Sequence, residues 1–338
     1  MLEKIIYILG AAFLFYAGYY LITSIGIFKK RKKVTNNNDD KKNFFAVIIA
    51  ARNEENVIGK LIDSLKKQSY PSEYFDIYVI VNNCTDNTAI EAKKAGAKVI
   101  SCTEKVSTKG EVLKYTFDLF KDNNKIDAYA IFDADNIVHH DFLAKMNDMI
   151  NSGYSVAQGF RDTKNISDNW LTSSYAILYY FQSLFLNESR YNMGRSSFLN
   201  GTGFVIKKEV IDKHGFNPKT VTEDVEFTAM CAINNEKIGF ATDAITYDEQ
   251  TNSFDVSWKQ RKRWSFGTME CLREYFPTLL KKGIKERNFE CFDVGLFYLS
   301  VISHVVFNLL PIFLFINIIL NLQKYIKLEL FQILFYPN

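Results

Sequence analysis

Two long stretches without charge, one near each end, limit what this chain can fold into. Residues 5–28 contain no charged side chain, and residues 294–322 contain no Asp, Glu, Lys or Arg. An apolar helix of about 20 residues crosses a bilayer core of about 30 Å. The pattern predicts a transmembrane anchor over residues 1–28 and one or more transmembrane segments over residues 293–322. The tail, residues 323–338, is left unassigned.

Basic residues flank each apolar stretch on one side. Residues 29–33 are all Lys or Arg, and Lys281, Lys282 and Lys285 precede the second stretch. A cleaved signal peptide carries its basic residues before the apolar run, so this order favours a retained anchor. The positive-inside rule places both basic flanks in the cytoplasm. We therefore expect a bitopic or multi-pass protein of the cell membrane with its middle part in the cytoplasm.

The composition of the middle part excludes several classes of protein. The chain is 48% apolar and 15% aromatic, which is too much for a disordered protein. Its net charge of +3 argues against a nucleic-acid binder. Its five cysteines are widely spaced, with no CxxC pair, which argues against a zinc ribbon or a disulfide framework. We expect a basic and polar linker at 29–43, a globular domain at 44–267 and an amphipathic interface segment at 268–292.

Strand and helix patterns alternate along the first half of this domain. Residues 44–50 form a continuous apolar run, as expected for a strand that is buried on both faces. The later expected strands are 76–81, 98–101 and 128–132, and the expected helices between them are 54–68, 88–95 and 109–120. This order predicts an α/β fold with a mostly parallel central sheet.

Polar clusters follow three of these strands: Arg52-Asn53-Glu54, residues 82–86, and Asp133-Ala134-Asp135. Ligands of parallel sheets bind at the carboxyl ends of the strands. Neither GxGxxG nor GxxxxGK[ST] occurs here, so a glycine loop of those kinds does not hold a nucleotide diphosphate. Two carboxylates that bind a divalent cation would supply the missing counter-charge.

Each chemical motif has a structural reading when it is taken alone. The pair at 133–135 is also what a capped helix or a solvated loop shows. Residues 222–224 (TED) also resemble a helix N-cap with an acidic first turn. Residues 260–264 (QRKRW) also suit a basic face on anionic lipid. The order and spacing of all three together are much more specific.

The ordered set resembles glycosyltransferase family 2, in the membrane-bound branch that includes cellulose, chitin and hyaluronan synthases and ceramide glucosyltransferases. The resemblance runs from residue 44 to residue 267. The matching pieces are residues 48–55 (IIAARNEE), 83–88 (NCTDNT), 109–110 (KG), 133–136 (DADN), 201–204 (GTGF), 222–224 (TED) and Gln260-x-x-Arg263-Trp264. It implies a GT-A fold flanked by transmembrane helices, and a nucleotide-diphosphate sugar as donor.

The resemblance also implies which residues bind the donor and the metal. Those of the nucleotide and donor side are Ala51, Arg52, Glu54, Asn82, Lys109 and Asp133. Asp135, with Asp133 nearby, would hold Mg²⁺ or Mn²⁺. Asn82 stands where relatives usually have an Asp that contacts the base; its carbonyl still accepts a hydrogen bond from uracil N3–H. A UDP-sugar is therefore the expected donor.

On the acceptor side the resemblance makes Asp224 the general base. One carboxylate base without a carboxylate nucleophile implies a single displacement with inversion. The other residues expected at the acceptor or the diphosphate are Gly203, Glu223, Gln260, Arg263 and Trp264. The apolar residues of 271–290, among them Tyr275 and Leu279, are expected to face lipid.

Three functions remain open at this point. The first is an inverting, membrane-bound glycosyltransferase that adds a hexose or N-acetylhexosamine to a growing β-linked polysaccharide. The second is a single-transfer glycolipid synthase with a lipid acceptor. The third is a catalytically silent scaffold that binds nucleotide sugars, against which the retained carboxylates and Trp264 argue. Few spans follow the catalytic region, so partner subunits for export of a polymer also stay open. We expect no nucleic-acid partner.

Overall fold

The computed structural model describes residues 2–31, 34 and 41–335, the last eight of these by their backbone alone. The described residues divide into two units. One consists of residues 23–295, and the other joins the residues before 23 to those after 295. Most of the predicted linker at 29–43, and the last three residues of the tail, lie outside the described residues.

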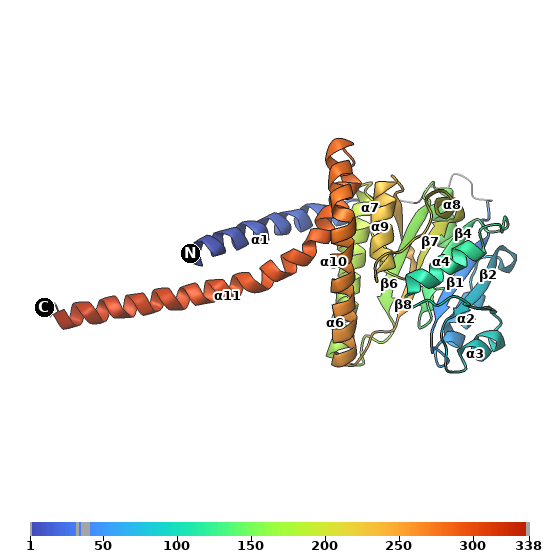
Figure 1. Cartoon of the computed structure of the whole chain (residues 1–338), viewed down its shortest axis with the longest axis horizontal. Coiled ribbons are helices and arrows are strands. Elements are labelled where there is room, and N and C mark those ends of the chain that lie inside the picture. Colours follow the sequence, from blue (N-terminus) through green and yellow to red (C-terminus); the bar gives the residue numbers. More distant parts are fainter. Residues whose placement is uncertain (1, 32–33, 35–40, 336–338) are drawn as a thin grey trace. The chain divides into compact units, whose positions relative to one another are not determined.

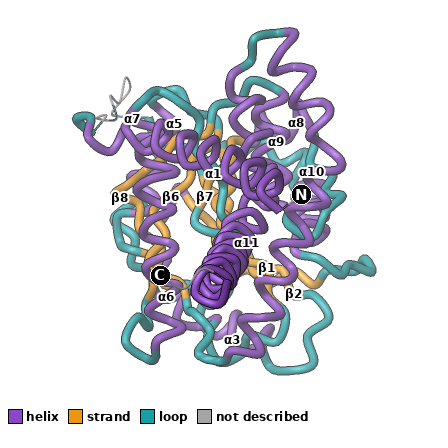
Figure 2. The backbone as a smooth tube through the Cα atoms, turned by 90° about the vertical axis from the view of Figure 1, so that its left-hand side faces the viewer, coloured by secondary structure: helices purple, strands orange, loops and turns teal. Residues whose placement is uncertain are grey.

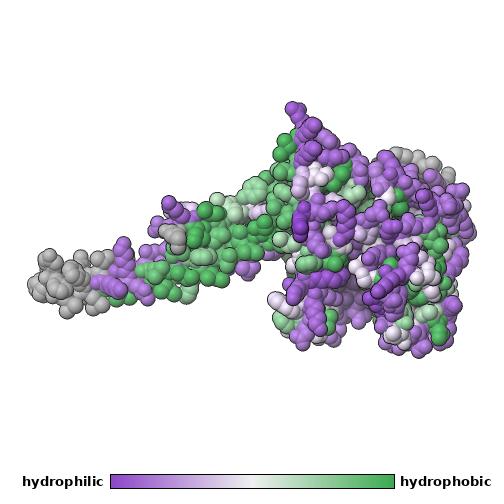
Figure 3. Space-filling view, viewed as in Figure 1, coloured by the Kyte–Doolittle hydropathy of each residue, from purple (hydrophilic) through white to green (hydrophobic). Residues whose placement is uncertain are grey.

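The terminal unit is built from two long helices, α1 (Leu2–Ser24) and most of α11 (Phe289–Phe335). The segments Leu2–Phe28 and Phe289–Lys327 are long and apolar enough to cross a membrane, and only 6% of each apolar window is buried. Their side chains form a mostly hydrophobic surface (Figure 3). Pro311 lies inside α11 without ending it, so the helix does not break there.

The larger unit contains one eight-stranded sheet. Its strands are β1 (Phe45–Ala51), β2 (Phe75–Val81), β3 (Lys98–Ser101), β4 (Ala128–Asp133), β5 (Ile137–Val138), β6 (Val156–Thr163), β7 (Phe204–Lys207) and β8 (Ile238–Asp248). The order across the sheet is β3-β2-β1-β4-β7-β6-β8-β5. Strands β3, β2, β1 and β4 are parallel, whereas β7 runs antiparallel to both of its neighbours. The mostly parallel α/β fold is confirmed.

Helices lie on both faces of this sheet (Figures 1 and 2). They are α2 (Ile58–Lys66), α3 (Thr88–Lys94), α4 (Lys109–Leu119), α5 (Phe142–Asn151), α6 (Trp170–Phe181), α7 (Ser189–Asn192), α8 (Lys208–His214), α9 (Glu223–Ile233) and α10 (Phe254–Lys285). A π-helix, Gln182–Glu188, joins α6 to α7. The expected strands and helices of the first half are confirmed to within a few residues. Helix α2 begins later than expected because Asn53 adopts a φ of 59°, which turns the chain after β1.

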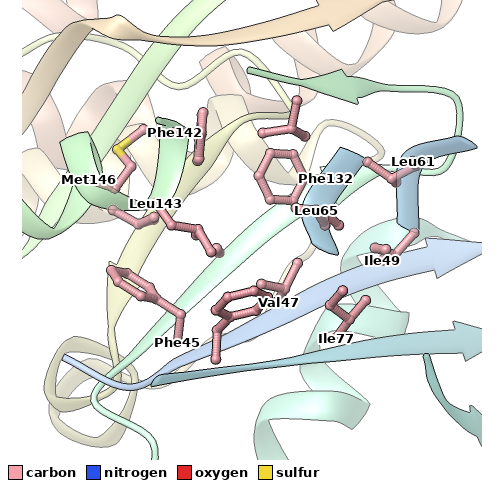
Figure 4. Packing of buried hydrophobic residues seen from close by; sticks show 14 of the residues in the cluster. Phe45, Val47, Ile49, Leu61, Leu65, Ile77, Phe132, Phe142, Leu143 and Met146 are labelled. Atoms are coloured by element: carbon pink, nitrogen blue, oxygen red, sulfur yellow. The ribbon is translucent and has the colours of Figure 1, made fainter. Parts of the chain in front are cut away.

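The core has two parts, one on each face of the sheet. Successive side chains of a strand point to opposite faces. Phe45, Val47 and Ile49 of β1 therefore pack with Leu61 of α2 and Phe142 of α5 (Figure 4). The alternate residues of β1 pack against the helices of the other face. This explains why β1 reads as an unbroken apolar run.

One expectation about the later segment is wrong. Tyr275 and Leu279 of α10, expected to face lipid, are buried at 8% and 0% exposure. The Tyr275 hydroxyl donates a hydrogen bond to Glu226 of α9. The amphipathic pattern of α10 thus reflects packing on the catalytic unit, because a helix stripe that covers a protein core has the same period as one that covers a bilayer.

Candidate active site

The nucleotide side of the site begins where β1 and β2 end. The Asn82 N–H donates to the carbonyl oxygen of Ala51 over 3.1 Å, which holds the two strand ends together. Asn82 is 4% exposed, and its Oδ1 has no hydrogen-bond partner among the described residues. A buried amide oxygen without a partner is costly. It is therefore suited to a ligand N–H, such as that of uracil.

Arg52 and Glu54 follow in the turn after β1. The exposed Arg52 guanidinium reaches the Val106 carbonyl at 3.4 Å. The backbone N–H of Glu54 donates to Thr88 Oγ1 over 2.8 Å. Burial raises the pKa of the Glu54 carboxyl, and the charge of Asp133 adds to this shift. The turn thus presents one cation and one carboxylate at the sheet edge where the Asp133 loop lies.

The Asp133 loop is held by hydrogen bonds to its backbone. Asn136 Oδ1 and Thr202 Oγ1 both accept from the Asp133 N–H, at 3.1 and 3.0 Å. The pKa of Asp135 is raised to about 8, first by burial and then by the neighbouring carboxylates of Asp248 and Asp133. Lys109 bonds to Asp133 and Arg161 bonds to Asp248, but the Asp135 carboxylate has no ion pair with any residue that the structure describes. These carboxylate oxygens are therefore suited to bind a hard divalent cation such as Mg²⁺ or Mn²⁺.

Lys109 connects the motif at residues 133–136, expected on the donor side, with the motifs at residues 201–204 and 222–224, expected on the acceptor side. Its Nζ donates to the Asp133 carboxylate and, over 2.7 Å, to the Gly201 carbonyl, and it lies 3.9 Å from Glu223 Oε1. Burial lowers the pKa of Lys109, but the charges of Asp133 and Glu223 outweigh it and raise the pKa overall. The lysine stands at the start of α4, which Thr108 and Glu111 cap.

Glu223 and Asp224 lie in the first turn of α9. Burial raises the pKa of both carboxyl groups, and for Glu223 the pKa reaches about 7. The positive charge of Lys109 lowers both pKa values and so partly offsets the effect of burial. Gly201 has a φ of +88°, and a Cβ there would lie 3.4 Å from Asp224 Oδ2. At Gly203, with φ +62°, a Cβ would lie 2.5 Å from Thr246 Oγ1. Both glycines are therefore needed for backbone conformation, and Gly203 for space as well.

Sequence reasoning missed a buried ion pair between Arg161 of β6 and Asp248 at the end of β8. Arg161 Nε donates to Asp248 Oδ2 over 2.9 Å, and its Nη1 donates to the Asn200 carbonyl over 2.9 Å. Asp248 also accepts from Asn136 Nδ2 at 2.9 Å. The sequence gives little sign of this ion pair, because Arg161 and Asp248 are 87 residues apart and belong to no common motif.

The Gln260-x-x-Arg263-Trp264 motif lies on α10. Trp264 meets the Tyr175 ring of α6 edge-on, with centroids 6.2 Å apart, and Tyr175 stacks on Tyr179. The Arg161 guanidinium lies 3.9 Å from the centre of the Tyr179 ring. Gln260 and Arg263 make no hydrogen bond or ion pair with any residue that the structure describes, and Arg263 is exposed. The structure thus links the tryptophan to the buried ion pair through two tyrosines.

Helix α10 is also packed against the turn that leads to Asp224. A Cβ at Gly267 would lie 2.4 Å from Thr222 Oγ1, so only glycine allows this approach. Around the motif, large apolar side chains are exposed on α6 and α10: Trp170, Ile177, Tyr180, Phe181, Phe254, Trp258 and Phe266. The motif therefore lies between the turn at residues 222–224 and a group of exposed apolar side chains.

Residues 42–267 match the family described as "Glycosyltransferase like family 2". The chain belongs to this family. Among curated relatives, the probable glycosyltransferase YdaM of Bacillus subtilis is 25% identical over 282 residues, which are 75% of this chain and 63% of the relative. The beta-monoglucosyldiacylglycerol synthase of Synechocystis sp. is 25% identical over 241 residues, which are 67% of this chain and 48% of the relative. The chain thus spans about half to two thirds of the length of these relatives.

Solved structures share the fold. The mannosyltransferase PcManGT from Pyrobaculum calidifontis, in complex with GDP-Man and Mn²⁺, has a TM-score of 0.71 and 15% identity; the match covers 100% of this chain and 93% of that one. S. aureus TarS 1–349 in complex with UDP-GlcNAc has a TM-score of 0.54 and 16% identity, covering 76% and 72%. At these identities the likeness shows the GT-A fold alone.

Proposed function

We propose that this chain transfers a hexose or N-acetylhexosamine from a UDP-sugar to a hydroxyl group, with inversion at the anomeric carbon. One observation carries the proposal. Lys109 bonds both to Asp133, on the donor side, and to the Gly201 carbonyl, beside Asp224. A donor and an acceptor bound to these motifs would therefore meet within one site.

On the donor side, Ala51, Arg52 and Glu54 would line the nucleotide pocket, and Asn82 Oδ1 would accept the base N–H. Asp135 and Asp133 would hold Mg²⁺ or Mn²⁺, and this cation would neutralise charge on the leaving diphosphate. Lys109 would add a further positive charge beside Asp133. Its contact with the Gly201 carbonyl also orients the backbone next to the acceptor.

On the acceptor side, Asp224 would take the proton from the attacking hydroxyl. A carboxyl whose pKa is raised holds that proton better than an exposed aspartate does, which suits a general base. Glu223 would support Asp224 or bind the acceptor, and Gly203 would let the backbone approach it. Gln260, Arg263 and Trp264 would cover the mouth of the site, where an indole face suits the C–H face of a sugar.

The acceptor that we favour is a membrane lipid with a diacylglycerol-like hydroxyl. Three curated relatives, at 24–25% identity, are named beta-monoglucosyldiacylglycerol synthases. In this chain, exposed Trp170 and Trp258 stand on the two helices that carry or contact Trp264. Exposed tryptophan side chains suit contact with a bilayer interface, from which a lipid acceptor would come.

A growing β-linked polysaccharide is the second candidate acceptor. Trp264 is partly exposed, and its indole is a surface on which a sugar unit could stack, whereas Tyr175 and Tyr179 behind it are buried and support the ring. This candidate would allow repeated transfer at the same Asp224. Partner subunits would then be needed to export the polymer.

The experiment uses the full chain in nanodiscs that contain diacylglycerol, with UDP-Glc, UDP-GlcNAc and GDP-Man as separate donors. Nucleotide release and the size of the labelled product are measured together. A small, organic-extractable product supports the lipid acceptor. A large, enzyme-digestible product supports the polysaccharide. Nucleotide binding without release from any donor would replace both with the silent scaffold.

A further inference from the structure

A second group of metal-ligating side chains lies outside the candidate active site. His139, His140 and Asp141 occupy the turn between β5 and α5, and one ligand atom from each lies within 4.8 Å of the other two. His140 Nε2 is 3.2 Å from Asp141 Oδ2, and the two imidazole rings are 4.4 Å apart. Bonds of about 2.1 Å at tetrahedral angles separate two ligand atoms by about 3.4 Å. The His140–Asp141 pair already has about this spacing, and the ligand atom of His139 lies within 4.8 Å of both.

The turn after α2 braces all three residues. Gln68 Nε2 donates to the His139 carbonyl over 2.9 Å, and the Ser69 N–H donates to the His140 carbonyl over 2.8 Å. Ser69 Oγ donates to Asp141 Oδ1 over 2.7 Å, which leaves Oδ2 directed at His140. Carboxylate ligands of metals are commonly held in this way, with one oxygen on the metal and the other hydrogen-bonded to a neighbour. The backbone of both histidines and the carboxylate of Asp141 are therefore held in place before any ion arrives.

The position of Asp141 points the same way. It is the N-cap residue of α5, where an Asp side chain ordinarily accepts a hydrogen bond from the first turn of the helix. Here the side chain makes no such capping bond and is directed at Ser69 and His140 instead. The carboxylate is thus used outside the helix, at the surface where the histidines lie.

The chemistry of this group differs from that of the Asp133 loop. Two imidazoles and one carboxylate suit Zn²⁺ and its transition-metal neighbours, whereas carboxylates alone suit Mg²⁺ and Mn²⁺. Strand β5 separates the two groups along the chain. A chelator could therefore act on two sites of different metal preference.

We propose that His139, His140 and Asp141 form a Zn²⁺ site, with water as the remaining ligand. The bound ion would fix the turn between β5 and α5, and so the segment that follows Asp135. It needs no nucleotide sugar and does not depend on the function proposed above.

The test uses the full chain, purified in detergent without a polyhistidine tag and stripped with EDTA. Zn²⁺ is titrated by calorimetry in the presence of excess Mg²⁺, and thermal unfolding is followed with and without Zn²⁺. We expect one equivalent of Zn²⁺ to bind and to raise the unfolding temperature. His140→Asn and His139→Asn should abolish this binding. Ser69→Ala, which removes only the supporting hydrogen bond, should weaken it about tenfold.

Asp63→Asn is the matched control, because Asp63 is an exposed carboxylate on α2 that ligates nothing in this scheme. It should bind Zn²⁺ as the parent chain does. His140 is a largely exposed side chain, so its replacement tests the site without loss of the fold. Equal Zn²⁺ binding by the parent and both histidine variants would overturn the proposal. So would binding that is lost in Asp135→Asn and kept in the histidine variants, since the ion would then belong to the Asp133 loop.

Discussion

The two carboxylate groups of the site differ in the positive charge around them. Beside Asp135 lie Asp248, Asp133 and Glu54, and the cation that opposes them is Lys164. Lys164 bonds to the backbone oxygen of Asp135 and to Glu249, and not to the Asp135 carboxylate. Beside Asp224, by contrast, lie the cations of Lys109 and Arg161. In the first group Lys109 bonds to Asp133 and Arg161 bonds to Asp248, so Asp135 is left without an ion-pair partner among the described residues. The comparison teaches that an added cation is needed at Asp135, whereas Lys109 and Arg161 already act on Asp224.

Of the experiments that test this comparison, removal of divalent metal should lower the rate of transfer the most. We expect EDTA to reduce transfer to background, since the bound metal would neutralise charge on the leaving diphosphate and Asp135 has no ion-pair partner among the described residues. Mg²⁺ or Mn²⁺ should restore transfer. Transfer is measured as nucleotide release from the donor. Full activity in excess EDTA would reject the assignment of Asp133 and Asp135 to a metal. If Zn²⁺ alone restored activity, the His139 site would be implicated instead.

Asp224→Asn should lower the turnover number by about 10²–10⁴, the usual contribution of a well-placed proton acceptor. Donor binding should stay within a few fold, because Asp224 belongs to the acceptor side. The two are measured separately, as turnover and as UDP affinity by calorimetry. A parallel loss of both would mean that Asp224 holds the donor and is not the base. Asp63→Asn again serves as the control.

Arg161→Gln should destabilise the fold by about 3–5 kcal/mol, because it leaves Asp248 buried without its cation. The free energy of unfolding is measured for the catalytic unit within the full chain. The double variant Arg161→Met with Asp248→Leu should recover much of that loss, since it removes the unpaired charge. An unchanged stability of the single variant would show that solvent reaches Asp248.

The pH dependence of transfer tests whether Lys109 lowers the pKa of Asp224 in the working enzyme. Asp224 must be deprotonated to accept a proton, and burial raises its pKa, so the rate should rise with pH through that raised pKa. The charge of Lys109 lowers the pKa of both Asp224 and Glu223. Lys109→Met should therefore move the rise to higher pH. If the maximal rate falls but the midpoint of the pH profile stays the same, Lys109 acts on the bound donor and not on Asp224.

The smallest effect is expected at Asn82. Asn82→Asp keeps an oxygen for the uracil N–H and loses only the amide, so UDP affinity should change by a few fold. Calorimetry with UDP and with GDP measures the preference of the site for the base. No change for either nucleotide would remove Asn82 from the base contact, whereas a strong gain for GDP would show that residue 82 selects the base.

The first half of the fold could be predicted because its signals are local. The strand over 44–50 and the helix over 109–120 have their own apolar patterns, and the structure places them at Phe45–Ala51 and Lys109–Leu119. The amphipathic pattern of α10 misled the prediction for Tyr275 and Leu279. A period of 3.6 residues shows that a face is buried, but it does not show whether protein or lipid covers it.

The candidate site could be predicted only in part. Asp133, Asp135 and Asp224 were recognisable because each lies in a short motif, but Arg161 and Asp248 were not. Their pairing depends on the parallel contact of β6 with β8, strands that lie far apart in the sequence. The same holds for His139 and Asp141, whose hydrogen-bond partners Gln68 and Ser69 lie 71 and 72 residues earlier in the sequence.

By itself the sequence determined the α/β class, the two apolar ends and the residue types at the strand ends, because these depend on near neighbours along the chain. The tertiary structure alone decided which charges share a space. It placed Lys109 between Asp133 and Gly201, and Arg161 against Asp248. The reason is electrostatic: the state of a carboxyl depends on its burial and on the charges around it, and the fold sets both.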